Sequence, residues 1–245
     1  RSSDLPGADA MRYIALHQSL TRRKMPECVF LPNIVDETKF RPRNEWPQEE
    51  IAAMRKELGA AEGERICFIP ARLSPVKGLV PMIELLEKPW LKGWRIVILG
   101  QGALHDEIVE TAKKRGLDAK IAILPYMPYA RMPLVFAASD LLMLPSVYDP
   151  NPLSVVEALW SGLPVALSDM AGNVEEGVTE GGNGWVLPVG DKEAFKGRLE
   201  EVFAAKPEEL RRMGRVSREK NAQFWNTEKT MTAFVERLVG SCGNV

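Results

Sequence analysis

Cysteine and histidine are scarce in this chain of 245 residues, which has three cysteines and two histidines. Cys28, Cys67 and Cys242 lack metal-like spacing, and three thiols cannot all pair within one chain. They fit small buried or inert thiols in a reducing compartment, so we expect a cytoplasmic protein. His17 and His105 have no partners at the spacing of a metal site or a catalytic triad. We therefore expect no metal ion and no cofactor.

A strong excess of charge is absent as well. Thirty-two lysines and arginines face 33 aspartates and glutamates, which gives a formal net charge of −1. No global field therefore attracts nucleic acid or an anionic membrane, and an anion site has to be local.

Long apolar runs are missing too. The longest candidate, "PLVFAASDLLMLP", is interrupted by Asp140 and falls short of the roughly 18 residues that a bilayer requires. We expect no transmembrane segment, and peripheral contact with the inner face of the membrane stays open.

From Arg65 onward, short apolar or β-branched runs alternate with segments of helical period. Six runs are apolar at both alternating positions: "RICFIPA", "WRIVILG", "KIAILPY", "DLLMLPS", "LPVALSD" and "GWVLPV". Strands buried on both faces predict a parallel sheet between helices, and right-handed crossovers make it a doubly wound, Rossmann-like α/β domain. Residues 8–23 predict one amphipathic helix, and residues 207–240 predict helices only.

Ligands of doubly wound sheets bind beyond the carboxyl ends of the strands. The stretch "YDPNPLSVVE" follows the fourth predicted strand and has the pattern of a helix start. Asn151 is a favoured N-cap, and Pro152 suits the first helical position. The free N–H groups of Leu153 and Ser154 then form an anion site together with the positive end of the helix dipole. An ordinary capped helix would have the same sequence.

Two carboxylates flank this helix start. Glu157 falls in an apolar run, where an unpaired buried carboxylate costs several kcal/mol, so it needs hydrogen-bond donors. The hydroxyls of a ribose would serve, and so would a neighbouring arginine or lysine. Asp149 is placed to accept from sugar hydroxyls, or it only forms the turn.

The loop "PARLSPVKG" after the first predicted strand contains Arg72 and Lys77. An arginine binds phosphate oxygens bidentately and a lysine adds a point charge, so the pair can neutralise a diphosphate held opposite the helix at 152–161. Tyr126 and Met127, after the third predicted strand, can cover a nucleobase or simply pack at the strand end.

The pattern "GQG" at 100–102 suggests a dinucleotide fingerprint. The third glycine is replaced by His105, and no acidic residue ends the next predicted strand, which argues against NAD.

Taken in order, several segments carry a resemblance that extends over residues 8–240. These are "LPNIVDETKFRP", "PARLSPVKG", "RIVILGQGAL", "AASDLLMLPSVYDPNPLSVVEALWSGLPVALSD", "AGNVEEGVTEGGNGWVLPVGD" and "FWNTEKTMTAFVERL". The chain resembles the C-terminal, donor-binding domain of retaining glycosyltransferases with the GT-B fold, family four (glycosyl transferases group 1). This group includes sucrose-phosphate synthases and bacterial cell-surface glycosyltransferases.

The resemblance implies metal-independent transfer of a sugar from a nucleoside diphosphate sugar, such as a UDP- or GDP-sugar, with retention of configuration. Arg72 and Lys77 would hold the diphosphate, Glu157 the ribose, and Asp149 the transferred sugar. The backbone at 151–154 would receive the phosphate or sugar, and 126–127 would border the base. Asp149 stands where the family usually has glutamate, so its contact with the sugar is expected to be looser, water-mediated or suited to a different sugar.

The same resemblance divides the chain into three parts. Residues 1–25 would be the last helix of a missing N-terminal acceptor domain, 26–215 the nucleotide-sugar-binding domain, and 216–245 a helical tail. We expect the natural start to lie upstream, the acceptor to be a glycan or a lipid-linked molecule, and the fragment alone to be inactive. Two alternatives stay open: a catalytically silent donor-binding or interaction module, and a GT-B sugar-nucleotide epimerase.

Overall fold

The computed structural model describes residues 19–20 and 34–242, so the helix predicted at 8–23 lies almost entirely outside the described residues. All six predicted strands are present, and every adjacent pair is parallel. The strands are β1 (Arg65–Pro70), β2 (Trp94–Leu99), β3 (Ile121–Leu124), β4 (Leu141–Leu144), β5 (Val165–Ser168) and β6 (Gly184–Leu187). The predicted α/β class with one parallel sheet is confirmed.

The strand order is β3-β2-β1-β4-β5-β6. The chain winds outward from β1 through β2 to β3, then returns to the centre and winds the other way from β4. Phe68 of β1 pairs with Leu142 of β4, and Phe68 also pairs with Val97 of β2. The loops that follow β1 and β4 therefore leave the sheet in opposite directions, which opens a crevice at their carboxyl ends.

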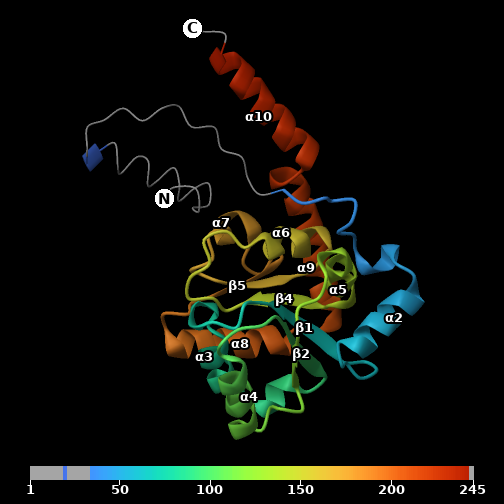
Figure 1. Ribbon diagram of the computed structural model, residues 1–245, viewed down its shortest axis with the longest axis vertical. Coiled ribbons are helices and arrows are strands. Elements are labelled where there is room, and N and C mark those ends of the chain that lie inside the picture. The colour runs from blue at the N-terminus through green and yellow to red at the C-terminus, as the bar shows by residue number, and fades with distance from the viewer. Residues whose placement is uncertain (1–18, 21–33, 243–245) are drawn as a thin grey trace.

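Helices cover both faces of the sheet (Figure 1). Ile66 and Phe68 of β1 pack in one buried cluster, with side chains of α2, α5 and α6. Cys67 and Ile69 face the other cluster, with side chains of α3, α4 and α8. Because successive strand residues point to opposite faces, an uninterrupted apolar strand is required for two such layers.

The helices alternate with the strands along the chain. Between strands lie α3 (Leu79–Leu85), α4 (His105–Lys114), α5 (Met132–Ala138), α6 (Leu153–Trp160) and α7 (Val174–Gly177). Outside them lie α2 (Gln48–Glu57), α8 (Lys192–Ala204), α9 (Pro207–Phe224) and α10 (Thr227–Cys242). Short 3-10 turns are η2 (Arg43–Glu45), η3 (Pro75–Lys77), η4 (Lys88–Leu91) and η5 (Tyr129–Arg131).

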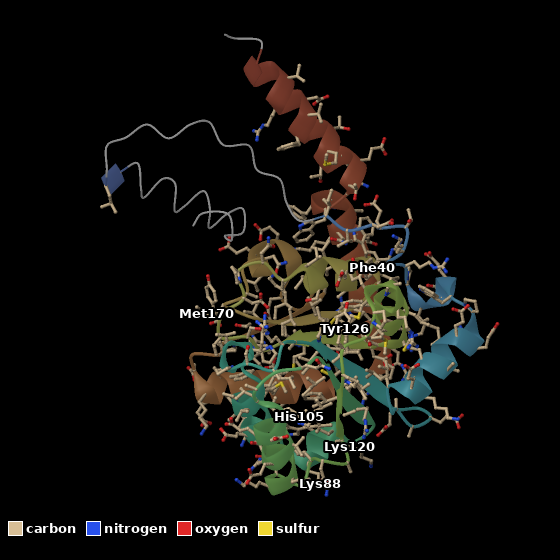
Figure 2. The ribbon with its side chains drawn as sticks, in the orientation of Figure 1. Phe40, Lys88, His105, Lys120, Tyr126 and Met170 are labelled. Carbon is tan, nitrogen blue, oxygen red and sulfur yellow. The ribbon has the colours of Figure 1, made fainter. Side chains whose placement is uncertain are left out.

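The predicted helical end of the chain is present as α9 and α10. The expected boundary at residue 216 falls inside α9, which continues to Phe224. Figure 1 shows α10 extending away from the sheet and its covering helices. The chain before β1 is anchored by Phe40, labelled in Figure 2, whose ring packs edge-on against Phe136 of α5 at 5.7 Å between centroids.

Candidate functional site

A cavity of about 680 Å³ opens at the carboxyl edge of the sheet. Its walls come from the loops after β1, β2 and β3, from the loop after β4, and from the first turns of α6. The lining residues are Pro70, Ala71, Arg72, Lys77, Leu99, Gly100, Gln101, Tyr126, Met127, Tyr129, Met132, Asp149, Pro152, Ser154 and Glu157. The cavity thus lies where the strand order reverses, as ligand sites of doubly wound sheets do.

Eight of the ten residues predicted for the site line this cavity. They come from four separate loops or helix starts: Arg72, Lys77, Tyr126, Met127, Asp149, Pro152, Ser154 and Glu157. Asn151 and Leu153 do not line it, and both are exposed.

The start of α6 differs from the prediction by one residue. Pro152, not Asn151, occupies the N-cap position, and the helix begins at Leu153. No side chain caps this end, because proline has no donor or acceptor to offer from its ring. Asn173 instead fixes the cap from outside, since its Nδ2 donates to the Pro152 carbonyl at 3.1 Å. Pro152 and Ser154 line the cavity, so the first turn of α6 lies at its wall, and a helix N-terminus there suits an anion.

Lys77 and Asp149 form an ion pair across the cavity, with 2.6 Å between Nζ and Oδ2. Backbone bonds hold the two loops together: the amides of Val147 and Tyr148 both donate to the Val76 carbonyl, at 2.9 and 3.3 Å. Gly78 makes this approach feasible, because its φ is +63° and a Cβ there would lie 2.1 Å from the Pro145 carbonyl oxygen.

The "GQG" segment also serves close packing of backbones. A Cβ on Gly102 would lie 2.2 Å from the Leu73 carbonyl oxygen, and one on Gly100 would lie 2.0 Å from that of Ala71. The Leu73 amide donates to the Gln101 carbonyl at 3.0 Å. These glycines therefore let the loop after β2 lie directly on the loop after β1, which accounts for the pattern without a dinucleotide.

Glu157 is buried, with 5% of its surface exposed. Burial raises the pKa of its carboxyl group, and a hydrogen bond from Tyr129 partly opposes this rise. Burial and the nearby Glu157 carboxylate raise the pKa of Tyr129 to about 12, so the phenol keeps its proton and donates. Within the described part of the chain Glu157 has no ion pair. The sequence left open a neighbouring arginine or lysine as the partner of Glu157. In the structure the partner is Tyr129.

Arg72 is exposed on the cavity wall, and its side chain has no hydrogen bond or ion pair with any described residue. Its guanidinium is accordingly available for a ligand. Tyr126 is 69% exposed, whereas Met127 is buried at 7%. Tyr126, labelled in Figure 2, belongs to the loop after β3. An exposed aromatic ring beside a buried thioether offers a flat apolar surface at the cavity mouth.

Sequence reasoning missed three cavity residues with side chains suited to binding: Gln101, Tyr129 and Met132. Tyr129 had a readable signal, because it lies in the same segment "PYMPYA" as Tyr126 and Met127. Its contact with Glu157 depends on the placement of η5 over α6, which no local pattern specifies.

The remaining candidates lie outside the cavity. His105 begins α4 and contacts Asp106 at 2.9 Å on the surface. Cys67 is a free, buried thiol, and burial raises its pKa. Among the described residues no group of three or more His, Cys, Asp or Glu side chains is arranged to hold a metal ion. Across those same residues no helix is long and apolar enough to cross a membrane.

The fold is a doubly wound α/β domain, and its carboxyl-edge cavity combines cations, a helix N-terminus and a buried carboxylate. Comparison with known proteins narrows this class. The model of the family "Glycosyl transferases group 1" matches residues 50–238. The chain belongs to this family, and its fold is that of the C-terminal-type domain of GT-B glycosyltransferases.

Curated relatives share this region. The chain is 29% identical over 193 residues to the D-inositol 3-phosphate glycosyltransferase of Nocardia farcinica, covering 75% of this chain and 41% of the relative. It is 26% identical over 192 residues to the putative glycosyltransferase EpsD of Bacillus subtilis, covering 78% of this chain and 49% of the relative. The chain therefore spans less than half the length of these two relatives.

Solved structures share the fold. Sucrose-phosphate synthase from Thermosynechococcus elongatus superposes with a TM-score of 0.74 at 19% identity, covering 93% of this chain and 56% of that one. Anabaena HepE, solved in complex with UDP and glucose, gives a TM-score of 0.72 at 20% identity, covering 86% of this chain and 56% of that one.

Proposed function

We propose that this chain is the donor-binding half of a retaining, metal-independent glycosyltransferase that uses a nucleoside diphosphate sugar. The observation that carries the proposal is the cavity itself, which gathers Arg72, Lys77, Glu157 and the open start of α6 at the carboxyl edge of the sheet. HepE, which shares the fold, was solved with UDP-glucose bound, and this favours a UDP-sugar over a GDP-sugar.

The proposed pose follows from the charges of the cavity wall. The diphosphate lies between the start of α6 and the loop after β1, where Arg72 and Lys77 neutralise it. The ribose hydroxyls donate to Glu157, which already accepts from Tyr129. The base lies against Tyr126 and Met127 at the cavity mouth, and the transferred sugar lies beside Asp149.

In the proposed reaction, the bond between the anomeric carbon and the diphosphate oxygen breaks. The acceptor hydroxyl oxygen bonds to the same face of that carbon, and its proton passes to the leaving diphosphate. Negative charge grows on the diphosphate, where Arg72, Lys77 and the α6 N–H groups stabilise it. The two cations supply the charge neutralisation that a divalent ion supplies in other transferases.

The ion pair between Lys77 and Asp149 gives these residues a shared role. Their side chains are 22% and 13% exposed, so water screens the pair only partly. A bound diphosphate would place Lys77 between two anions, phosphate and Asp149. Asp149 then both orients the lysine and reaches toward the sugar, despite being one methylene shorter than the glutamate usual in the family.

Acceptor binding belongs to residues outside the described fold. We propose that the acceptor, a glycan or a lipid-linked molecule, is bound by an N-terminal domain of the longer protein, and that this chain alone does not transfer sugar. We further propose a cytoplasmic location with contact at the inner face of the membrane. This chain covers only 41% and 49% of two curated relatives, which supports a separate domain for the acceptor.

Binding of UDP to the chain, measured by isothermal titration calorimetry, tests the donor site. Arg72→Ala is expected to weaken binding by about tenfold or more, because it removes a charge-assisted hydrogen bond to phosphate. Arg237→Ala is the matched control, since Arg237 is exposed on α10 and far along the chain from the cavity. Absence of UDP and GDP binding to folded chain would contradict the proposal.

Catalysis is tested on a full-length version that includes the upstream sequence. Release of nucleoside diphosphate is followed for a panel of nucleotide sugars, with and without extracted glycan and lipid acceptors. Acceptor-dependent release supports the transferase. Binding without any release would instead favour a silent donor-binding module.

A further inference from the structure

A second cavity, of about 570 Å³, lies at the opposite edge of the sheet. It is bordered by Arg65 at the start of β1, by Asp140 directly before β4, and by the loop 161–164 directly before β5. Its other walls are η2 and the first half of α9. Because β1 has six residues, roughly 20 Å of strand separates this amino-end cavity from the donor cavity.

Close backbone packing builds the cavity. A Cβ on Gly214 of α9 would lie 2.0 Å from the Gly162 carbonyl oxygen, so α9 lies directly on the loop that precedes β5. Arg211, Arg215 and Arg218 follow at helical spacing around this contact and line the cavity from α9. The close contact between α9 and this loop forms one wall of the cavity, and the arginines of α9 lie along it.

The charge of the lining is one-sided. Five arginines line the cavity, namely Arg43, Arg65, Arg211, Arg215 and Arg218, whereas Asp140 is the one acidic residue among the lining. Asp140 is already bound by Arg43 at 2.9 Å and by Arg55 at 3.0 Å. Just outside the lining, Glu45 lies 3.7 Å from Arg218 and Glu208 lies 3.4 Å from Arg211. Cations still exceed carboxylates in a chain whose net charge is −1.

Three of the arginines also have a structural role. Arg43 donates to the carbonyls of Ala137, Ala138 and Ser139 at the end of α5. Arg218 donates to the Trp160 carbonyl at the end of α6, at 3.2 Å, and Arg65 donates to the Ala205 carbonyl. Carbonyls at a helix end carry only about half a unit of negative charge, so they do not cancel a guanidinium.

Arg211 and Arg215 have no such role. Arg211 is 65% exposed at its side chain and meets only Glu208. Arg215 is exposed, and its side chain has no hydrogen bond or ion pair with any described residue. Beside them the lining is mixed: Leu163, Pro164 and Leu210 are apolar, whereas Asn44, Gln48, Ser139 and Ser161 are polar. Small-molecule sites likewise combine apolar wall with a few polar groups in a volume of several hundred Å³.

We infer that the amino-end cavity is a second ligand site, which binds a small phosphomonoester with an apolar carbon part. Arg211 and Arg215 bind the phosphate, and the apolar wall of Leu163, Pro164 and Leu210 holds the carbon part. The inference does not depend on the donor site.

Phenyl phosphate is the probe, because it joins a phosphate to an apolar ring. Titration into the ¹⁵N-labelled chain is expected to shift the amides of Gly162, Leu163, Gly214 and Arg215. Phenyl phosphate is expected to bind more tightly than either inorganic phosphate, which lacks the ring, or phenol, which lacks the phosphate. Equal affinity for inorganic phosphate would indicate an adventitious ion only and overturn the inference.

The double variant Arg211→Ala/Arg215→Ala is expected to weaken binding by about tenfold or more. Neither side chain holds a backbone carbonyl, so the fold is expected to persist; if it does not, the single variant Arg215→Gln replaces the double one. Arg237→Ala, on α10, is expected to leave phenyl phosphate binding unchanged. Shifts confined to 72–78 and 151–157, or equal losses in Arg237→Ala, would overturn the inference.

Discussion

At the scale of single residues, Glu157 shows a conflict between binding and stability. Its carboxylate is buried in the first turns of α6 and has Tyr129 as its hydrogen-bond donor among the described residues. Burial disfavours the charged form, which is why its pKa is raised. A ligand with two vicinal hydroxyls would supply the missing donors. Glu157 therefore lowers the stability of the chain when the cavity is empty and would strengthen the binding of such a ligand.

The variant Glu157→Gln is expected to stabilise the folded chain at pH 7. A carboxyl group whose pKa is higher in the folded than in the unfolded chain contributes most stability below its ordinary pKa, and this contribution is lost as the pH rises through the raised value. Glutamine carries no charge at any pH and still accepts from Tyr129. The free energy of unfolding in urea is therefore expected to exceed that of the native sequence at pH 7, and the gap is expected to shrink on acidification.

Glu62→Gln is the matched control for Glu157→Gln, since Glu62 is an exposed glutamate before β1. Its stability is expected to stay within about 0.5 kcal/mol of the native sequence. UDP binding by Glu157→Gln is expected to be weaker, because an amide oxygen accepts less strongly than a carboxylate. Lower stability of Glu157→Gln at neutral pH would show that the carboxylate has stronger partners than Tyr129.

At the scale of elements, glycines decide how closely helices and loops pack. Gly214 lies inside α9, where a side chain would normally favour the helix, yet its Cβ would lie 2.0 Å from the Gly162 carbonyl oxygen. Gly197 lies inside α8 with nothing within 4 Å of the same position. Both glycines lie inside an α-helix, but a Cβ on Gly214 would clash with backbone, whereas a Cβ on Gly197 would meet open space.

Gly214→Ala is expected to destabilise the chain by about 2 kcal/mol or more, because backbone must move to admit the methyl group. Gly197→Ala is expected to stabilise it by about 0.5–1 kcal/mol through helix propensity. Urea unfolding followed by circular dichroism measures both. Equal effects of the two substitutions would mean that α9 does not lie on the loop before β5.

Most of the fold was predictable because the strand interiors are apolar on both faces, as a sheet covered by helices on both sides requires. The helices α2 and α8 were not among the predicted elements, although the Asp191 side chain caps α8 by accepting from two amides at 3.1 Å. Arg72, Lys77 and Glu157 were identifiable because each lies at a strand's carboxyl end or in the helix after it. Tyr129 and the amino-end cavity depend on which helix packs over which loop, and single-segment patterns do not contain that information.

At the scale of the whole molecule, the packed body ends close to the start of α10. Trp225 is 4% exposed and joins the cluster formed by α5, α6 and the strands, whereas its neighbour Phe224 is 50% exposed. Beyond them, α10 extends outward and leaves Val235 49% exposed. The beginning of α10 touches the body through Thr227, whose hydroxyl donates to the Val35 carbonyl at 3.2 Å. Trp225 therefore anchors the junction between α9 and α10 to the packed body.

Trp225→Ala is expected to cost about 3–5 kcal/mol in the free energy of unfolding, as the loss of a buried tryptophan does. Phe224→Ala is expected to cost less than about 1 kcal/mol, because half of this adjacent ring is already in water. Urea unfolding of both variants, followed by fluorescence of the other tryptophans, makes the comparison. Similar losses would mean that α10 folds onto the body and buries Phe224. A large loss for Trp225→Ala alone would mean that the packed body ends at that residue and that α10 adds little to its stability.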